Sequence, residues 1–156
     1  MEQQKQPAPA RPTAAFVGAS WVALGIGASL FFIGLYNAHM LLSEKGFYFA
    51  VFLLGIFAAV SVQKAVRDRA EDIPVTGVYL GVSWSMLLAS LILMTAGLWN
   101  ADLLLSEKGF YGIGFAMSLF AVVAVQKNVR DLAAARDGDP APARPRPPLF
   151  PPPPAP

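Results

Sequence analysis

The sequence predicts an all-α membrane protein with four transmembrane helices, arranged as two parallel-repeat helical hairpins between disordered Pro-rich tails. Three observations lead to this fold class. Of the 156 residues, 55% are hydrophobic and only 14% are charged, whereas soluble domains usually carry about 25% charged residues. Four long stretches contain no charged residue. The octapeptide LLSEKGFY occurs twice, at residues 41–48 and 104–111.

Proline marks the two tails. Thirteen of the 14 prolines lie within residues 1–12 or 140–156, and the exception is Pro74. Because proline interrupts continuous helices, the body between the tails is predicted to be helical. The tails cannot bury a core, so we expect residues 1–12 and 133–156 to be disordered, with polyproline II character at the C-terminus.

The four uncharged stretches are candidate membrane spans. A bilayer core about 30 Å thick needs about 20 helical residues, so the first and third stretches are long enough to tilt and the other two are near the short end. Transmembrane strands would require a period-two alternation that is missing here. A cleaved signal peptide would require a shorter apolar core in the first stretch, of about 7–15 residues. The predicted spans cover residues 13–38, 46–63, 73–101 and 109–126.

The chain repeats itself at an offset of 63 residues. Between residues 16–68 and 79–131, 27 of 53 aligned positions are identical, including GLYNA with GLWNA and VQKAVRD with VQKNVRD. Each unit therefore reads as helix, short polar turn, helix and basic end. We expect units at 13–69 and 79–132 joined by a linker at 70–78. Since two helices per unit is an even number, both units enter the membrane in the same direction.

The distribution of lysine and arginine predicts the orientation. Ten of these residues lie in the tails, in the middle loop and at the basic helix ends, whereas Lys45 and Lys108 alone lie in the turns. By the positive-inside rule, both termini and the middle loop are cytoplasmic and both octapeptide turns face outward.

The octapeptide has the composition of a hairpin turn at a membrane boundary. Ser43 or Ser106 is suited to cap the following helix, and the adjacent glutamates suit its positive end. Each lysine is suited to pair with its neighbouring glutamate or with a headgroup phosphate, and the asparagines to hydrogen-bond across the hairpin. Identity over eight residues also fits a symmetric partner or a recent duplication. The candidate outward-facing turn contacts are Asn37, Glu44, Lys45, Asn100, Glu107 and Lys108.

The basic ends carry the motif QKxVRD, in which lysine and aspartate are four residues apart and can pair on a helix. These residues are expected to be snorkelling anchors, with binding of anionic lipid headgroups as an extension of that role. The candidate cytoplasmic lipid or partner contacts are Gln63, Lys64, Arg67, Gln126, Lys127 and Arg130.

Small residues recur at four-residue spacing within the predicted helices, a pattern that favours close helix packing. We expect them to form contacts within the molecule, although a dimer face would use the same pattern. They are Gly25 and Ser29, then Gly81, Ser85 and Ala89, and then Gly114 and Ser118.

The sequence contains few residues of the types that catalyse reactions. It has no cysteine and a single histidine, His39, which aligns with Asp102 in the second unit. Thiolate chemistry and histidine metal clusters are thereby excluded, and no paired acid–base residues share a depth in the membrane. We therefore predict no enzyme, no cofactor, no metal and no nucleic-acid partner.

The arrangement GLYNA…LLSEKGFYFAV…QKAVRD, repeated as GLWNA…LLSEKGFYGIGF…VQKNVRD, resembles the YiaA/YiaB two-helix family of bacterial inner-membrane proteins over about residues 13–131. The resemblance implies a multi-pass inner-membrane protein with four helices and carries no activity with it. The function predicted is a non-enzymatic scaffold, accessory or stress-related membrane component, and the alternative is a small transporter or channel subunit. The predicted partners are the lipid bilayer and a membrane protein or further copies of the chain.

Overall fold

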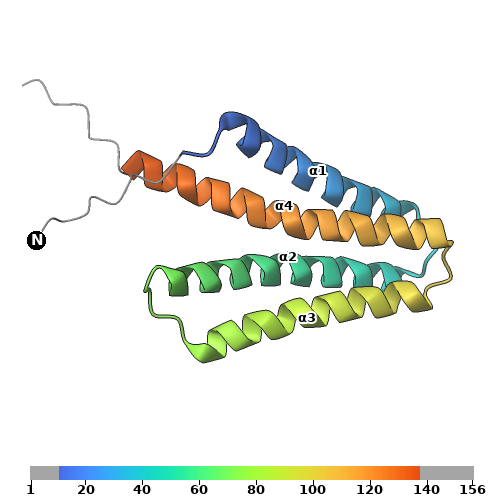
Figure 1. Ribbon diagram of the computed structural model, residues 1–156. Coiled ribbons are helices and arrows are strands. Elements are labelled where there is room, and N and C mark those ends of the chain that lie inside the picture. The colour runs from blue at the N-terminus through green and yellow to red at the C-terminus, as the bar shows by residue number, and fades with distance from the viewer. Residues whose placement is uncertain (1–10, 138–156) are drawn as a thin grey trace, which may run out of the picture.

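The computed structural model describes residues 11–137, which form four long helices and, within that range, no strand (Figure 1). Each helix is long and apolar enough to cross a membrane, which confirms the predicted fold class. A 24-residue helix is about 36 Å long, more than the hydrocarbon thickness of about 30 Å. The C-terminal tail is predicted to begin at residue 133, but residues 133–137 are the last turn of the fourth helix. Apart from these residues and 11–12, the predicted tails lie outside the described residues. The helices are α1 (Ala14–Asn37), α2 (Leu42–Ala70), α3 (Gly77–Asn100) and α4 (Leu105–Asp137).

The bundle has two chemically different ends. At the turn end, residues 38–41 join α1 to α2 and residues 101–104 join α3 to α4. At the opposite, basic end, α1 begins, α4 ends and residues 71–76 join α2 to α3 (Figure 1). Both outer helices start on a threonine cap, because the hydroxyls of Thr13 and Thr76 accept hydrogen bonds from the backbone nitrogens of Phe16 and Tyr79.

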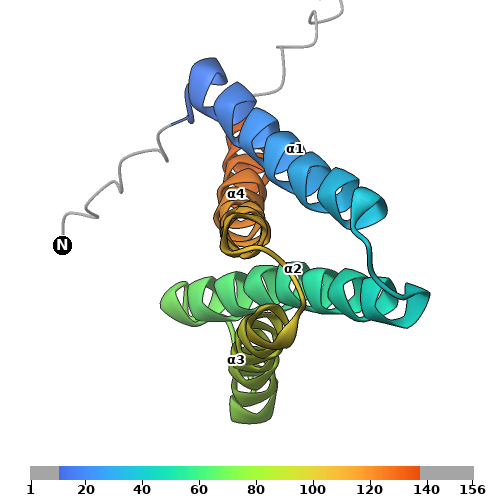
Figure 2. The same cartoon turned by 90° about the vertical axis from the view of Figure 1, so that its right-hand side faces the viewer.

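The helices are ordered α1, α4, α2, α3 across the bundle, so α2 and α4 are central and α1 and α3 are peripheral (Figure 2). The principal packing pairs are α1 with α4 and α2 with α3, and the two helices of one unit touch each other little. Each unit is joined as a hairpin, but its helices pack mainly against the other unit. Each helix of one repeat therefore has its principal packing partner in the other repeat, an arrangement that we call the exchange of helices.

Two of the close helix contacts place a glycine against a serine. A Cβ added to Gly27 on α1 would lie 2.7 Å from Ser118 Oγ on α4, and one added to Gly55 on α2 would lie 3.2 Å from Ser90 Oγ on α3. Positions 27 and 90 correspond in the repeat, as do 55 and 118. The two interfaces therefore use the same pair of residue types in reversed order, and each keeps the small volume that close packing requires.

The predicted small-residue contacts are correct for Gly114 and Ser118 but wrong for Gly25 and Gly81. A Cβ on either of the last two glycines would meet nothing within 4 Å. Four-residue spacing identifies one face of a helix but not the face that meets a neighbour. On α1 that face is marked instead by the buried residues Ser20, Gly27, Phe31 and Leu35.

Aromatic side chains fill the space between the helices. The ring centroids of Phe31 and Phe52 are 4.6 Å apart, those of Phe52 and Phe115 are 5.9 Å apart, and those of Phe31 and Tyr111 are 5.7 Å apart. Such pairs stabilise a core beyond the area they bury. Because these rings come from α1, α2 and α4, they join both units into one core.

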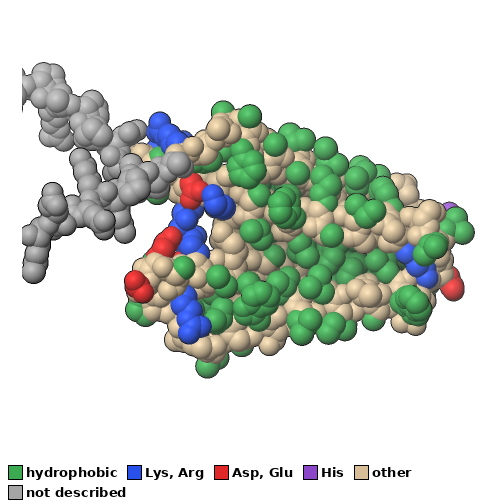
Figure 3. Space-filling model, in the orientation of Figure 1, with side chains coloured by type: hydrophobic (Ala, Val, Ile, Leu, Met, Phe, Trp, Pro, Cys, Tyr) green, Lys and Arg blue, Asp and Glu red, His purple; other side chains and the backbone are tan. Residues whose placement is uncertain are grey.

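The outer surface is apolar over the middle of the bundle and charged at its two ends (Figure 3). Large side chains point outward from every helix, among them Ile33, Phe57, Leu88 and Phe120. Soluble monomeric proteins rarely expose large apolar side chains all around their surface in this way. It is the surface expected of helices that face lipid hydrocarbon.

Candidate functional site

The two turns are held by the same hydrogen bonds. Glu44 Oε2 accepts a hydrogen bond from Leu41 N at 2.8 Å, and Glu107 Oε2 accepts one from Leu104 N at 2.9 Å. The lysine that follows each glutamate closes the preceding helix. Lys45 Nζ donates to the carbonyl oxygen of Tyr36 at 2.7 Å, and Lys108 Nζ donates to that of Trp99 at 3.0 Å.

These bonds correct the expected turn chemistry in three respects. The capping is done by the glutamates rather than by Ser43 or Ser106. The lysines bond to backbone carbonyls rather than to the neighbouring carboxylates. The amides of Asn37 and Asn100 donate within their own helices, to the carbonyls of Ile33 and Ala96 at 2.8 Å, and not across the hairpin. For the lysines the reason is local, because the carbonyls of Tyr36 and Trp99 are among the last four of α1 and α3 and have no partner within the helix backbone.

The aromatic residues of each octapeptide reach the other unit. Phe47 and Tyr48 lie against Gly97, and Phe110 and Tyr111 lie against Gly34. Gly34 and Gly97 are the first residues of GLYNA and GLWNA. The two repeated motifs therefore fit together crosswise, the octapeptide of one unit against the GLxNA segment of the other.

This crosswise contact leaves a pocket on each side of the turn end. The first turn-end pocket, of about 430 Å³, is lined by His39, Glu44, Tyr48, Asn100 and Asp102 among others. The second turn-end pocket, of about 370 Å³, contains the corresponding residues of the other interface. Its polar lining is Asn37, Ser106, Glu107 and Tyr111.

The structure therefore regroups the predicted turn contacts. Glu44 shares a pocket with Asn100 of the second unit, and Glu107 shares one with Asn37 of the first. The two lysines stay at the turns of their own units. The buried tyrosines that complete the pockets were not among the predicted site residues, although they are present in both copies of the octapeptide.

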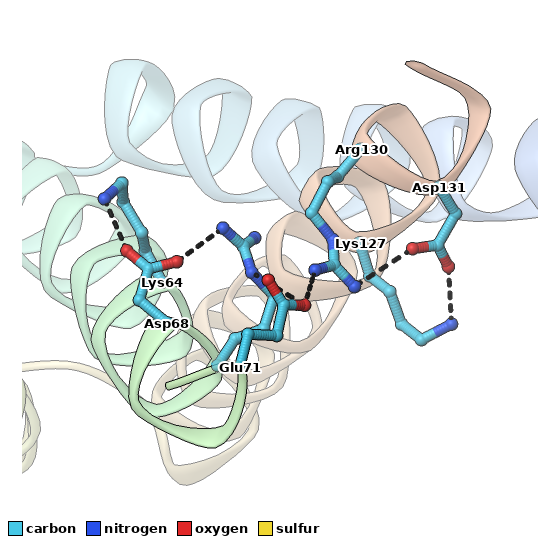
Figure 4. Close-up of polar contacts among 7 residues, drawn as sticks. Lys64, Asp68, Glu71, Lys127, Arg130 and Asp131 are labelled. Atoms are coloured by element: carbon cyan, nitrogen blue, oxygen red, sulfur yellow. Dashed lines mark hydrogen bonds and ion pairs between the residues drawn. The ribbon is translucent and has the colours of Figure 1, made fainter. Parts of the chain in front are cut away.

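At the basic end, the two QKxVRD motifs meet in a network of ion pairs (Figure 4). Lys64 Nζ lies 2.6 Å from Asp68 Oδ2, and Lys127 Nζ lies 2.9 Å from Asp131 Oδ2, as the four-residue spacing predicts. Arg67 lies 2.7 Å from Asp68 and Arg130 lies 3.2 Å from Asp131. Each motif thus pairs its carboxylate with two of its own cations.

Glu71 links the two motifs. Its carboxylate pairs with Arg130 on α4, and its Oε1 lies 3.7 Å from Arg67 Nε on its own helix. The corresponding position in the second unit is Ala134, so this link breaks the symmetry of the repeat. The sequence analysis did not select Glu71, and the only sequence signal was that it lies four residues after Arg67.

Several buried polar atoms near the basic end have no hydrogen-bond partner within the described part of the chain. They include Oε1 of Gln63 and of Gln126, which are equivalent in the repeat, and Oδ1 of Asn128. Asn128 is fully buried, and its amide nitrogen donates to Ser20 Oγ at 3.0 Å. The predicted anchors differ in exposure, because the side chains of Lys64 and Lys127 are more than half exposed and that of Arg67 is mostly covered.

Four apolar spans, an internal repeat and polar groups gathered at the two ends define a helical membrane protein built from two similar units. The family model described as the yiaA/B two helix domain matches residues 16–68 and again residues 79–131. The chain belongs to this family.

Two relatives are similar to the chain. One is the inner membrane protein YiaA of Escherichia coli (strain K12), which is 55% identical over 117 residues, covering 75% of this chain and 81% of that protein. The other is the uncharacterized membrane protein YubF of Bacillus subtilis (strain 168), which is 48% identical over 63 residues, covering 40% of this chain and 72% of that protein. No solved structure matches the chain.

Proposed function

We propose that the protein is a non-enzymatic scaffold, accessory or stress-related component of the bacterial inner membrane. The inner-membrane location is supported by the name of the Escherichia coli relative. Both termini and the segment 71–76 lie on the cytoplasmic side, and the turn end faces outward, because ten of the 12 lysines and arginines lie at the basic end or in the tails.

The observation that carries this proposal is the separation of aromatic core from polar ends. Phe31, Phe52 and Phe115 fill the middle of the bundle. Charged side chains form a network at one end, and two pockets with polar residues in their linings lie at the other end. The packed helical bundle therefore holds polar groups on both sides of the membrane, where they are available for contact. Units 13–69 and 79–132, with the linker 70–78, act in this proposal as one body.

The two ends have different contacts. At the basic end, exposed Lys64 and Lys127 attract anionic lipid headgroups, and Arg67 and Arg130 hold the ends of the central helices in place. Gln63 and Gln126 directly precede these lysines, and their buried Oε1 atoms have no hydrogen-bond partner within the described residues. At the turn end, the pockets receive a membrane-protein partner, a second copy of the chain or a lipid headgroup.

A small transporter or channel subunit is the alternative, and fully buried Ser90 and Ser118 on opposite sides of the core would be its polar lining. Their hydroxyls, however, donate to helix carbonyls, Ser90 to Leu87 at 2.8 Å and Ser118 to Gly114 at 2.7 Å. Transporters also place ionisable residues at membrane depth as a rule. We therefore favour the scaffold role.

Photo-crosslinking in native membranes tests the proposal. A crosslinking amino acid is placed at Ser43 for the turn end, at Arg69 for the basic end and at lipid-facing Phe57 as the control. We expect discrete protein adducts from the first two positions and only lipid adducts from Phe57. The scaffold role would be rejected if neither end gave a protein adduct above the control. Solute flux in reconstituted vesicles that the empty vesicles lack would favour the transporter.

The orientation has its own test. A reporter active only in the cytoplasm is fused after residue 73 and, in a second protein, after residue 103. We expect activity from the first fusion and none from the second, and the reverse pattern would invert the proposed topology.

A further inference from the structure

Two mostly buried tyrosines carry hydroxyl groups that have no hydrogen-bond partner within the described residues. Tyr48 and Tyr111 are each only 5% exposed, and neither forms a side-chain hydrogen bond within residues 11–137. A buried tyrosine usually finds a partner for its hydroxyl. Neither hydroxyl oxygen is among the fully buried atoms that lack a partner, so both are accessible from outside the core. At two equivalent positions, therefore, a hydroxyl group is available to a group that comes from outside the chain.

Both hydroxyls are at pockets. Tyr48 lines the first turn-end pocket and Tyr111 lines the second. The hydroxyl of Tyr48 lies beside Gly97, which lines the same pocket, and the hydroxyl of Tyr111 lies beside Gly34, which lines the other. Each phenol therefore directs its polar end toward the space between the two units.

The carboxylates that line the pockets favour a positively charged ligand. Glu44, Asp102 and His39 line the first pocket and Glu107 lines the second, so carboxylates outnumber the one basic group, and neither described lining contains a lysine or an arginine. Lys45 and Lys108 are bound to the carbonyls of Tyr36 and Trp99. Each glutamate receives a single backbone hydrogen bond through Oε2, so it retains acceptor capacity for a ligand's N–H group.

The depth of the pockets indicates where the ligand comes from. Asn37 and Asn100, which line the pockets, directly follow Tyr36 and Trp99, whose side chains are 82% exposed. Exposed tyrosine and tryptophan at helix ends mark the headgroup level of a membrane. The pockets therefore open among the lipid headgroups, and their volumes are in the range that holds a small ligand.

We propose that each turn-end pocket binds a primary ammonium group. One N–H donates to the tyrosine hydroxyl oxygen, a second donates to the glutamate carboxylate, and Phe47 or Phe110 offers a ring to the charge. The first pocket binds more tightly because Asp102 adds a second carboxylate. The ammonium belongs to the ethanolamine headgroup of an aminophospholipid or to a free amine. This inference rests on the proposed use of the turn end for contacts and names the chemistry of the ligand.

Native mass spectrometry of the full-length protein in detergent tests the sites. Phosphatidylethanolamine is titrated into delipidated protein and compared with phosphatidylglycerol, which lacks the ammonium, and with phosphatidylcholine, whose quaternary ammonium has no N–H to donate. Two bound ethanolamine lipids are expected, with affinity at least about tenfold above that for the other two lipids. Competition by free ethanolamine distinguishes the two sources of the ammonium. Displacement at millimolar concentration indicates a free amine, and retention indicates the lipid.

Substitutions in each pocket distinguish the two binding events. Tyr48→Phe and Glu44→Gln should each weaken one of the two binding events about tenfold, and Tyr111→Phe and Glu107→Gln should weaken the other. Asp102→Asn should affect only the tighter event. Glutamine is accepted at the capping position, so the helix start is kept. Asp72→Asn removes the same charge at the basic end and is the matched control.

Equal binding of the three lipids by the wild-type protein would overturn the proposal, and so would wild-type binding by the tyrosine and glutamate variants. Circular dichroism of each variant verifies the fold, and the lipid comparison on the wild-type protein stands even if a variant does not fold. The scaffold role is judged separately by crosslinking. Crosslinks at Ser43 with no preference for ethanolamine lipids would remove the ammonium sites and leave that role in place.

Discussion

The ring of Tyr48 lies against Gly97 of the other unit, so closely that a methyl group on Gly97 would be inside normal contact distance of it. A Cβ on Gly97 would lie 3.1 Å from Tyr48 Cε1 and 2.7 Å from Phe47 Cε1. The equivalent contact joins Tyr111 and Gly34. The repeated octapeptide is therefore part of the tertiary structure as well as a turn, because its last two residues seat one unit on the other.

We expect Gly97→Ala to lower the thermal stability of the protein in detergent. The new methyl group would force the rings of Phe47 and Tyr48 to shift, and overpacking of this kind costs about 1–3 kcal/mol. Gly109→Ala is the matched control, because a Cβ there meets nothing within 4 Å and alanine is the better helix former. Thermal unfolding followed by circular dichroism measures both. A Gly97→Ala protein as stable as the control would contradict the crosswise fit.

The reversed glycine–serine pairs predict a measurable coupling. Gly27→Ser should destabilise the protein, because its Cβ would lie 2.7 Å from Ser118 Oγ. Adding Ser118→Gly gives α1 and α4 the residues that α3 and α2 already have at the equivalent positions, and it should restore part of the loss. Gly114 O and Ser118 N, both 3.2 Å from that Cβ, limit the recovery. A double-mutant cycle should give a coupling energy of about 0.5–3 kcal/mol, and additive effects would argue against the interface.

The buried Asn128–Ser20 pair predicts an unequal effect of deleting its two members. Ser20→Ala leaves a fully buried amide without its acceptor and should cost about 1–3 kcal/mol. Asn128→Ala removes the amide together with its unpartnered Oδ1, and it reproduces the alanine at equivalent position 65. It should therefore cost less than Ser20→Ala. Unfolding of the two single variants and the double variant provides the comparison, and the reverse order would refute this account.

Glu71 predicts how the basic end responds to anionic lipid. Its carboxylate pairs with Arg67 and Arg130, so it competes with a lipid phosphate for both guanidinium groups. Glu71→Gln should raise the affinity for phosphatidylglycerol about fivefold, corresponding to about 1 kcal/mol for one charge near the membrane surface. Asp72→Asn changes the charge equally but removes no such pairing. Equal gains in the two variants would show that only net charge matters.

The exchange of helices predicts that the chain can be divided. Two polypeptides, residues 1–72 and 73–156, should co-purify when produced together, because α1 packs on α4 and α2 on α3. Introducing Gly97→Ala into the second polypeptide should reduce the yield of the complex. Recovery of the two halves as separate monomers would be incompatible with the observed packing.

The sequence predicted the fold class, the four spans and the repeat because these depend on composition, length and direct comparison of residues. It could not predict which helices pack together. Covalent order places α1 beside α2, and only the three-dimensional fit of residues such as Gly97 and Tyr48 reveals the exchange. For the same reason Glu44 and Asn100 were identified singly, whereas their shared pocket was not.

The short connection between α2 and α3 has a consequence for assembly. Residues 71–76 tether two non-identical halves that would otherwise have to find each other by diffusion in the membrane, and a short tether supplies millimolar effective concentrations. The one-to-one ratio of the halves is thereby fixed when the chain is synthesised.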